Sequence, residues 1–77
     1  MEKLIQCFAE VLMIKPEEVN DSLEYSSKGW DSVAHMAIIS SIEEAFDIMI
    51  DTEDVIAMSS FAKAKEILKK YGIEIDA

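Results

Sequence analysis

Apolar positions recur at helical spacing from the first residues of the chain. In residues 2–14 they fall on one face of a 3.6-residue period, which predicts an amphipathic helix. That face consists of Leu4, Ile5, Phe8, Val11 and Leu12. Because Pro16 disfavours a helical backbone at the residue before it, we expect this helix to stop by residue 15.

A second helix is predicted to begin at Asp31 or Ser32 and to end near Asp47. Asp31 suits the N-cap position, because its carboxylate can accept a hydrogen bond from the N–H of Ala34. The apolar face of this helix is broad and consists of Val33, Met36, Ile38, Ile39, Ile42 and Phe46. A face of that kind is typical of a helix that packs against a core.

Two more helices are predicted after the second, a short one over residues 53–57 and a longer one over residues 60–71. The candidate N-caps are Asp51 or Thr52 for the short helix and Ser59 or Ser60 for the longer one. Gly72 suits the left-handed position that often follows the end of a helix. The chain beyond it, residues 73–77, is expected to fray.

Residues 15–30 are predicted to form a long loop, because turn-forming residues such as Asn20, Ser26 and Gly29 are concentrated there. Residues 16–18, Pro-Glu-Glu, suit the first turn of a short helix. The loop also carries apolar side chains that we expect to pin it across the helices, namely Val19, Leu23, Tyr25 and Trp30. A loop of this length in a compact domain often has a function.

These elements predict an all-α fold, a small four-helix bundle of three longer helices and one short helix with a long loop between helices one and two. A chain of 77 residues makes one domain, which we expect to span residues 1–77. Cys7 is the one cysteine, so an internal disulfide is excluded, and we expect its thiol to be buried among apolar side chains.

The charge balance narrows the class of partner. Sixteen acids against seven basic residues give a formal net charge of −9, which argues against nucleic acid and against an anionic membrane surface. No apolar run approaches the roughly 20 residues that a membrane-spanning helix needs. We therefore expect a cytoplasmic monomer, without membrane insertion, whose partners are proteins with basic patches.

The start of the second helix is the first candidate for chemistry. Ser32 follows a loop and opens the helix, where free backbone N–H groups form a locally positive end. A phosphate attached to that serine would be stabilised there. The same Asp-Ser pair is also an ordinary capping sequence, and the local pattern alone favours that simpler interpretation.

A stretch without basic residues surrounds this serine. From Gly29 to Ala62 there is no lysine or arginine, and the acids in it are Asp31, Glu43, Glu44, Asp47, Asp51, Glu53 and Asp54. Glu43 and Asp47 repel one another across one helical turn by about 0.2–0.5 kcal/mol, and the helix dipole disfavours anions at that end. Such a surface either docks a partner or serves only as a solvated acidic face, and the residues alone leave both open.

The stretch from Gly29 to Val33, Gly-Trp-Asp-Ser-Val, resembles the G-x-D-S-L attachment motif of acyl carrier proteins, the phosphopantetheine-binding carrier domains. Glu43-Glu44-x-Phe46 is similar to the E-E-x-F that closes helix two in that family, at the same distance from the serine. The resemblance continues through Asp47 and residues 50–55 and spans nearly the whole chain.

This resemblance implies a carrier rather than an enzyme. In the family, a phosphopantetheinyl transferase moves a 4'-phosphopantetheine arm from coenzyme A onto the motif serine, which corresponds to Ser32. The preceding aspartate, here Asp31, assists that modification. The thiol of the arm then carries an acyl or aminoacyl group as a thioester, which a loading ligase supplies and a downstream synthase or transferase removes.

The resemblance also implies a surface that docks partner enzymes. Its acidic candidates are Glu43, Glu44, Asp47, Asp51, Glu53 and Asp54, and its apolar candidates are Val33 and Met36. Ala34 and Ala37 stand where fatty-acid carriers commonly have acids, and Val33 replaces the usual leucine. These departures favour a dedicated carrier, for a secondary metabolite, a modified sugar or an amino acid, over general service in fatty acid biosynthesis.

Two other classes of function are disfavoured by the sequence. A hydrolase using Asp31, Ser32 and His35 is disfavoured, because three neighbours in one helical turn do not form the line of groups that triad chemistry needs. A calcium buffer lacks the required loop of alternating acids. The alternative that stays open is an acidic helical interaction module with no prosthetic group.

His35 has two possible roles, either as a contact near the arm or as an exposed polar residue of the first turn.

Overall fold

The computed structural model describes residues 2–73, and within that range the predicted all-helical fold is confirmed. The longer helices are α1 (Glu2–Leu12), α2 (Ser32–Phe46) and α4 (Phe61–Lys70), and the short one is α3 (Thr52–Ala57). A 3₁₀ turn, η1 (Pro16–Glu18), occupies the predicted place in the loop between α1 and α2. No strand occurs among these residues, only an isolated bridge between Glu24 and Ser60.

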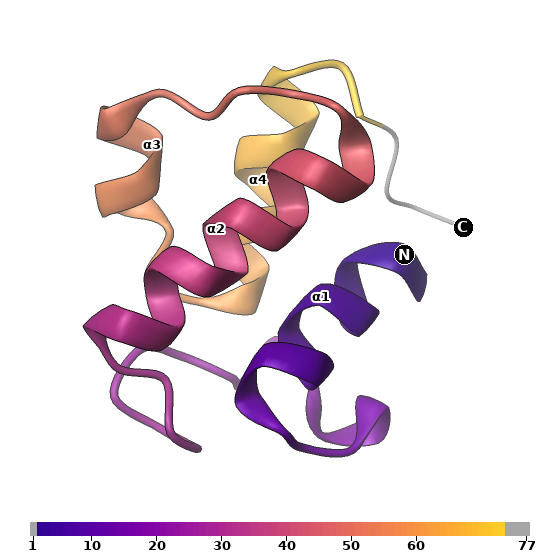
Figure 1. The fold of residues 1–77 in the computed structure, drawn as a ribbon, viewed down its shortest axis with the longest axis vertical. Coiled ribbons are helices and arrows are strands. Elements are labelled where there is room, and N and C mark those ends of the chain that lie inside the picture. Colours follow the sequence, from indigo (N-terminus) through magenta and orange to yellow (C-terminus); the bar gives the residue numbers. More distant parts are fainter. Residues whose placement is uncertain (1, 74–77) are drawn as a thin grey trace.

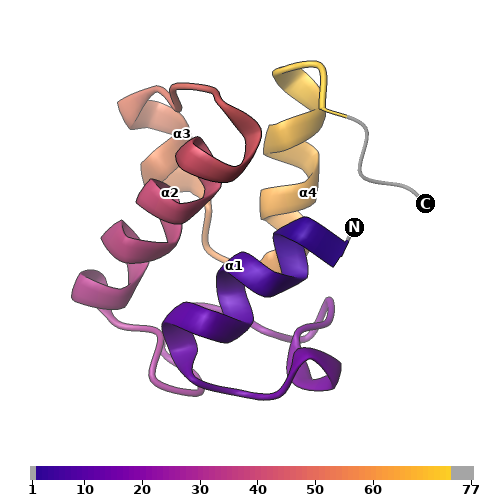
Figure 2. The same ribbon diagram turned by 45° about the vertical axis from the view of Figure 1, so that its right-hand side comes forward.

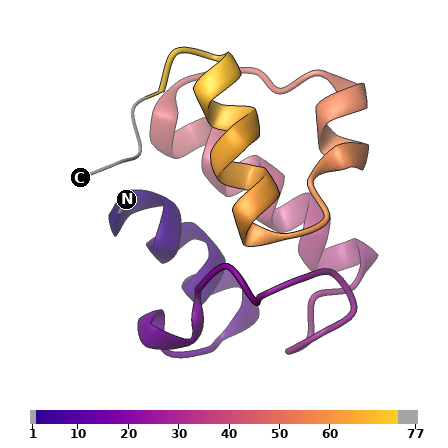
Figure 3. The same cartoon turned by 180° about the vertical axis from the view of Figure 1, so that it is seen from behind.

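The three longer helices enclose the core, and α3 lies to one side of them. α1 packs against α2, and α4 lies behind α2 in the view of Figure 1. Turning the molecule shows α1, α2 and α4 as separate sides of the bundle, with the α1–α2 loop passing beneath them (Figure 2). Seen from behind, α4 lies in front of α2, and α3 lies on the far side of α4 from α1 (Figure 3).

Edge-on aromatic contacts join the long loop to the helices. The Phe8 ring lies with its centroid 5.2 Å from that of Trp30 and 5.3 Å from that of Phe61, both in edge-to-face geometry. All three side chains are buried, so α1, the end of the loop and α4 meet at one point. Cys7 is buried beside this cluster as a free thiol, as the sequence predicts.

The loop is pinned as expected by three of its four apolar side chains. Val19, Leu23 and Trp30 are buried, whereas Tyr25 is 41% exposed and contributes only one face to the packing. Backbone hydrogen bonds from Tyr25 N to Ser59 O (2.9 Å) and from Phe61 N to Leu23 O (3.0 Å) join the loop to the start of α4. The loop is therefore fixed at its middle as well as at its ends.

The first helix ends at Leu12, two residues before the predicted end at residue 14. Met13 adopts a left-handed backbone with φ of 57°, and the N–H of Ile14 bonds the carbonyl of Ala9 at 3.1 Å. This is a Schellman ending, so the left-handed Met13 ends the helix, and Pro16 lies beyond that end. The same motif ends α4 at Gly72, whose φ is 82°, as predicted.

Candidate functional site

Asp31 caps α2 as the sequence predicts. Its backbone is extended, and its Oδ1 accepts a hydrogen bond from Ala34 N at 2.9 Å. The first intrahelical bond runs from His35 N to Asp31 O at 2.8 Å. Ser32 is the first helical residue and is exposed, and its hydroxyl makes no hydrogen bond to any other residue in the range 2–73. The cap therefore holds a free serine hydroxyl at the surface.

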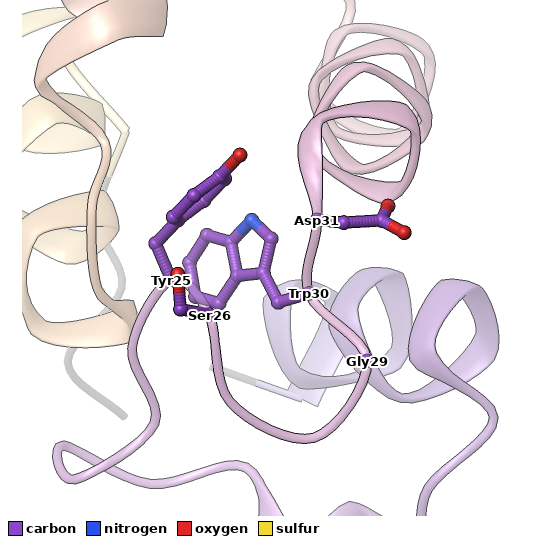
Figure 4. Close-up of a pocket in the computed structure, with 5 residues that line it drawn as sticks. All are labelled: Tyr25, Ser26, Gly29, Trp30 and Asp31. Carbon is purple, nitrogen blue, oxygen red and sulfur yellow. The ribbon is translucent and has the colours of Figure 1, made fainter.

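A tight loop presents this helix start. Ser26 N donates to Trp30 O at 2.9 Å and Trp30 N donates to Ser27 O at 3.0 Å, so residues 26–30 close on themselves. Gly29 adopts φ of 82°, a left-handed conformation that costs glycine little. An open pocket of about 280 Å³ lies against this loop and is lined by Tyr25, Ser26, Gly29, Trp30 and Asp31. Figure 4 shows the Trp30 ring turned toward Tyr25, and the Asp31 carboxylate directed away from both.

Of the two interpretations that the sequence offered, a contact near the arm stays a prediction, whereas His35 is not an exposed polar residue. It is half-buried, stacks on Trp30 with ring centroids 5.9 Å apart, and accepts a hydrogen bond from Trp30 Nε1 on Nδ1 at 3.0 Å. Its Nε2 lies 2.7 Å from the carbonyl oxygen of Val55. His35 is thus a structural link between the loop and α3. In the sequence His35 lies five residues after Trp30, but this spacing predicts a contact between the two side chains only when the conformation of the loop is known.

Exposed apolar side chains occur on α2 close to Ser32 in sequence and on α3. Val33 is 80% exposed and Met36 is 57% exposed on α2, while Ile56 on α3 is 77% exposed. The sequence pattern assigned Val33 and Met36 to the apolar face of α2, and both lie on its outer side instead. Ile56 was not singled out from the sequence, because a short helix gives no clear periodicity.

Four of the six acids expected on the docking surface are exposed, namely Glu44, Asp47, Asp51 and Glu53. Glu43 is half-buried, and its Oε2 accepts a hydrogen bond from Ile50 N at 2.8 Å. This bond is a compensation, invisible in the sequence, for placing a carboxylate near the end of α2. Asp47 follows the helix in a left-handed backbone with φ of 55°, so its carboxylate stands just beyond the last turn.

Asp54 corrects the expectation that all six acids face solvent. It is buried, with Lys70 Nζ donating to Oδ1 at 2.7 Å and Tyr71 Oη donating to Oδ2 at 2.6 Å. Hydrogen bonding from Lys70, and then from Tyr71, lowers the pKa of Asp54 below its usual value. Tyr71 Oη also accepts from Asp51 N at 2.9 Å. Asp54 therefore joins α3 to the end of α4 and is not available to a partner.

A comparison with protein families identifies the family of this chain. The family model described as a phosphopantetheine attachment site matches residues 2–68, most of the chain. The chain belongs to the phosphopantetheine-attachment family. No curated protein matches it with significant similarity. The assignment favours a carrier over an acidic interaction module without a prosthetic group, and it establishes 4'-phosphopantetheine as the covalent cofactor.

The start of α2 fits such a group. The N–H groups of Ser32 and Val33 precede the first intrahelical bond and so have no acceptor within the helix, which favours a phosphodiester anion nearby. A group attached to the exposed Ser32 hydroxyl would not disturb the core. When bound, the arm supplies a thiol that can hold a cargo as a thioester. Asp31 caps α2, and the closed loop of residues 26–30 leads into the helix start where the Ser32 hydroxyl lies.

Carrier domains of this family are typically non-catalytic, are modified by a phosphopantetheinyl transferase and interact with synthases. Within residues 2–73 no group of three or more histidine, cysteine, aspartate or glutamate side chains is arranged to hold a metal ion. No helix in this described part of the chain is long and apolar enough to cross a membrane.

Proposed function

We propose that Ser32 is the attachment residue and that this carrier holds an acyl or aminoacyl group as a thioester on its arm. One observation carries the proposal: in a chain of this family, Ser32 presents a free, exposed hydroxyl at the capped start of α2. Modification turns that hydroxyl into a phosphodiester with the arm that coenzyme A supplies.

Asp31 has two roles in this proposal, one for each carboxylate oxygen. Oδ1 caps α2 through Ala34 N, whereas Oδ2 makes no hydrogen bond within the described residues. Because Asp31 is exposed, Oδ2 can face a docked transferase beside the serine. Asp31 thus keeps the serine in place and offers a charge that assists its modification.

The proposed docking surface has an apolar and an acidic part. Its apolar part consists of Val33 and Met36, which follow Ser32 on α2, and Ile56 on α3. Its acidic part lies farther along α2 and α3 and consists of Glu43, Glu44, Asp47, Asp51 and Glu53. A partner that fits it has an apolar hollow bordered by basic side chains, since complementary charge guides association and apolar contact holds the complex. The transferase, a loading ligase and a downstream synthase or transferase are the partners that we propose.

The composition of α2 favours a dedicated carrier. Its first half, from Ser32 to Ala37, carries no acid, so apart from the cap residue Asp31 the acids that guide docking lie in the second half of α2 and beyond it. A ligase that matches this charge distribution would bind less well to a carrier with acids in the first half of its helix. We therefore propose a cargo specific to one pathway, such as an amino acid or a short acid.

Intact mass after incubation with coenzyme A and a broad-specificity transferase tests the attachment. The wild type is expected to gain the mass of the arm, and Ser32→Ala is expected to gain none. Ser40→Ala, which removes an exposed serine two turns along the same helix, is the matched control and should be modified like the wild type. Failure of the wild type to gain mass with several active transferases would contradict the proposal.

A further inference from the structure

His35 makes two side-chain hydrogen bonds with opposite requirements. The Trp30 indole N–H can only donate, so Nδ1 of His35 must accept it at 3.0 Å. The carbonyl of Val55 can only accept, so Nε2 of His35 must carry the proton that is shared at 2.7 Å. Only one form of the ring can make both hydrogen bonds at once, namely the neutral imidazole with its proton on Nε2.

These bonds join three parts of the chain at the serine end of α2. Trp30 ends the loop, His35 lies in the first turn after Ser32, and Val55 lies in the middle of α3. Trp30 is itself fixed, since it is buried against Phe8 with ring centroids 5.2 Å apart. The ring of Tyr25 also packs edge-on against His35 at 5.9 Å. The imidazole of His35 is therefore fixed by Trp30 and Tyr25 of the loop, and its Nε2 is positioned to bind the Val55 carbonyl of α3.

Besides this bond, α3 is held by apolar packing and by Asp54. Val55 is half-buried and packs against the core, Asp54 and, just past the end of α3, Met58 are buried, and Ile56 is exposed. Asp54 is bound to Lys70 and Tyr71 of the α4 end, which fixes α3 to α4 but not to α2. Among the side-chain hydrogen bonds of the described residues, the one from His35 to Val55 is the link between helical α2 and α3.

We infer that His35 is a positioning residue, which holds α3 and its Ile56 in register with Ser32 so that a partner meets both at once. The inference rests on the proposed docking surface. Loss of the link should loosen α3 and weaken docking, because Val33 and Met36 on α2 would no longer keep a fixed distance from Ile56 on α3. The start of α2 keeps its Asp31 cap, so the chemistry at a docked serine should be unaffected.

Three variants separate positioning from plain stability. His35→Phe keeps a planar ring but loses both hydrogen bonds, whereas His35→Gln keeps an acceptor and a donor. Val19→Ala, at a buried loop position away from α3, is the matched destabilised control. With a transferase, His35→Phe is expected to raise KM several-fold with kcat nearly unchanged, His35→Gln to restore most of it, and Val19→Ala to leave KM as in the wild type.

Nuclear magnetic resonance of the unmodified protein tests the same link without the transferase. The ¹⁵N shifts of His35 are expected to show the neutral form protonated on Nε2. In His35→Phe the amides of Val55 and Met58 are expected to exchange faster, with Ala64 of α4 unchanged. An Nδ1-protonated ring, unchanged exchange in α3, or an unchanged KM for His35→Phe would overturn the inference. Absence of modification in the wild type would instead overturn the proposed function, and the resonance results would still decide this one.

Discussion

Lys70 Nζ lies 2.7 Å from Oδ1 of Asp54, and this ion pair ties the last turn of α4 to α3. Tyr71 Oη closes the same connection by donating to Oδ2 of Asp54 and accepting from Asp51 N. The carboxylate thus accepts two hydrogen bonds in a buried position. Removing it leaves the ammonium of Lys70 without its acceptor and separates α3 from α4.

The stability of the fold should depend on the charge of Asp54 at acid pH. Its pKa is lowered in the folded protein by Lys70 and then Tyr71, so the unfolded state binds a proton more readily. The contribution is full above the unfolded pKa of about 3.9 and is lost as pH falls through the lower folded value. Urea unfolding should show Asp54→Asn less stable than the wild type at pH 7, with the difference shrinking below about pH 4. A constant difference from pH 7 to pH 2 would contradict this prediction.

Substitutions at Asp31 should separate the effect of its capping hydrogen bond on stability from the effect of its charge on modification. Asp31→Ala is expected to lower the free energy of unfolding by about 1 kcal/mol, because Ala34 N loses its acceptor. Asp31→Asn should retain nearly all the stability, since asparagine caps as well as aspartate. If the charge assists modification, both variants should be modified more slowly by the transferase. Equal rates in Asp31→Asn and the wild type would leave Asp31 with the capping role alone.

Replacing Asp47 should increase the stability of the fold and weaken the docking of partner enzymes. It holds a left-handed backbone at the negative end of the α2 dipole, so Asp47→Asn, which tolerates that backbone, should add about 0.3–1 kcal/mol to the free energy of unfolding. The same change removes an exposed acid and should raise KM for partner enzymes, more strongly at low salt. Glu17→Gln in η1 removes an equal charge far along the chain from α2 and α3 and is the control. Equal effects on KM from both variants would show that only net charge matters.

Ile56 should matter for partners and not for folding. It is 77% exposed on α3, so Ile56→Ser should change the free energy of unfolding by no more than about 0.5 kcal/mol. If Ile56 belongs to the apolar part of the docking surface, the same variant should lower kcat/KM for modification several-fold. Met13→Ser removes an even more exposed apolar side chain at the end of α1 and should have no effect. An unchanged kcat/KM for Ile56→Ser would remove it from the surface.

The local parts of the fold were predictable from the sequence because they depend on neighbours in the chain. The Asp31 cap on Ala34 N, the Ser60 cap on Lys63 N and the left-handed Gly72 all involve residues within one turn. The predicted end of α1 was wrong by two residues, because methionine rarely adopts the left-handed conformation that Met13 has, and its residue type therefore gives no sign of it.

The longer-range parts of the site were not predictable. Asp54 pairs with Lys70 sixteen residues away, and His35 bonds Val55 twenty residues away. Nothing in the local pattern distinguishes Asp54 from its exposed neighbour Glu53, because burial at that position depends on where α4 ends. The cap and the start of α2 could be predicted because Asp31, Ser32 and Ala34 are neighbours in the chain. The side chains that contact the rest of α2 depend on how the helices pack.

Mapping the modified residue tests the central claim most directly. Wild-type protein is incubated with coenzyme A and a transferase that modifies a reference carrier, digested, and fragmented in a mass spectrometer. The expected result is that the fragment ions place the arm on Ser32 and on neither Ser26 nor Ser40. An arm on any other residue, or no arm while the reference carrier is fully modified, would contradict it.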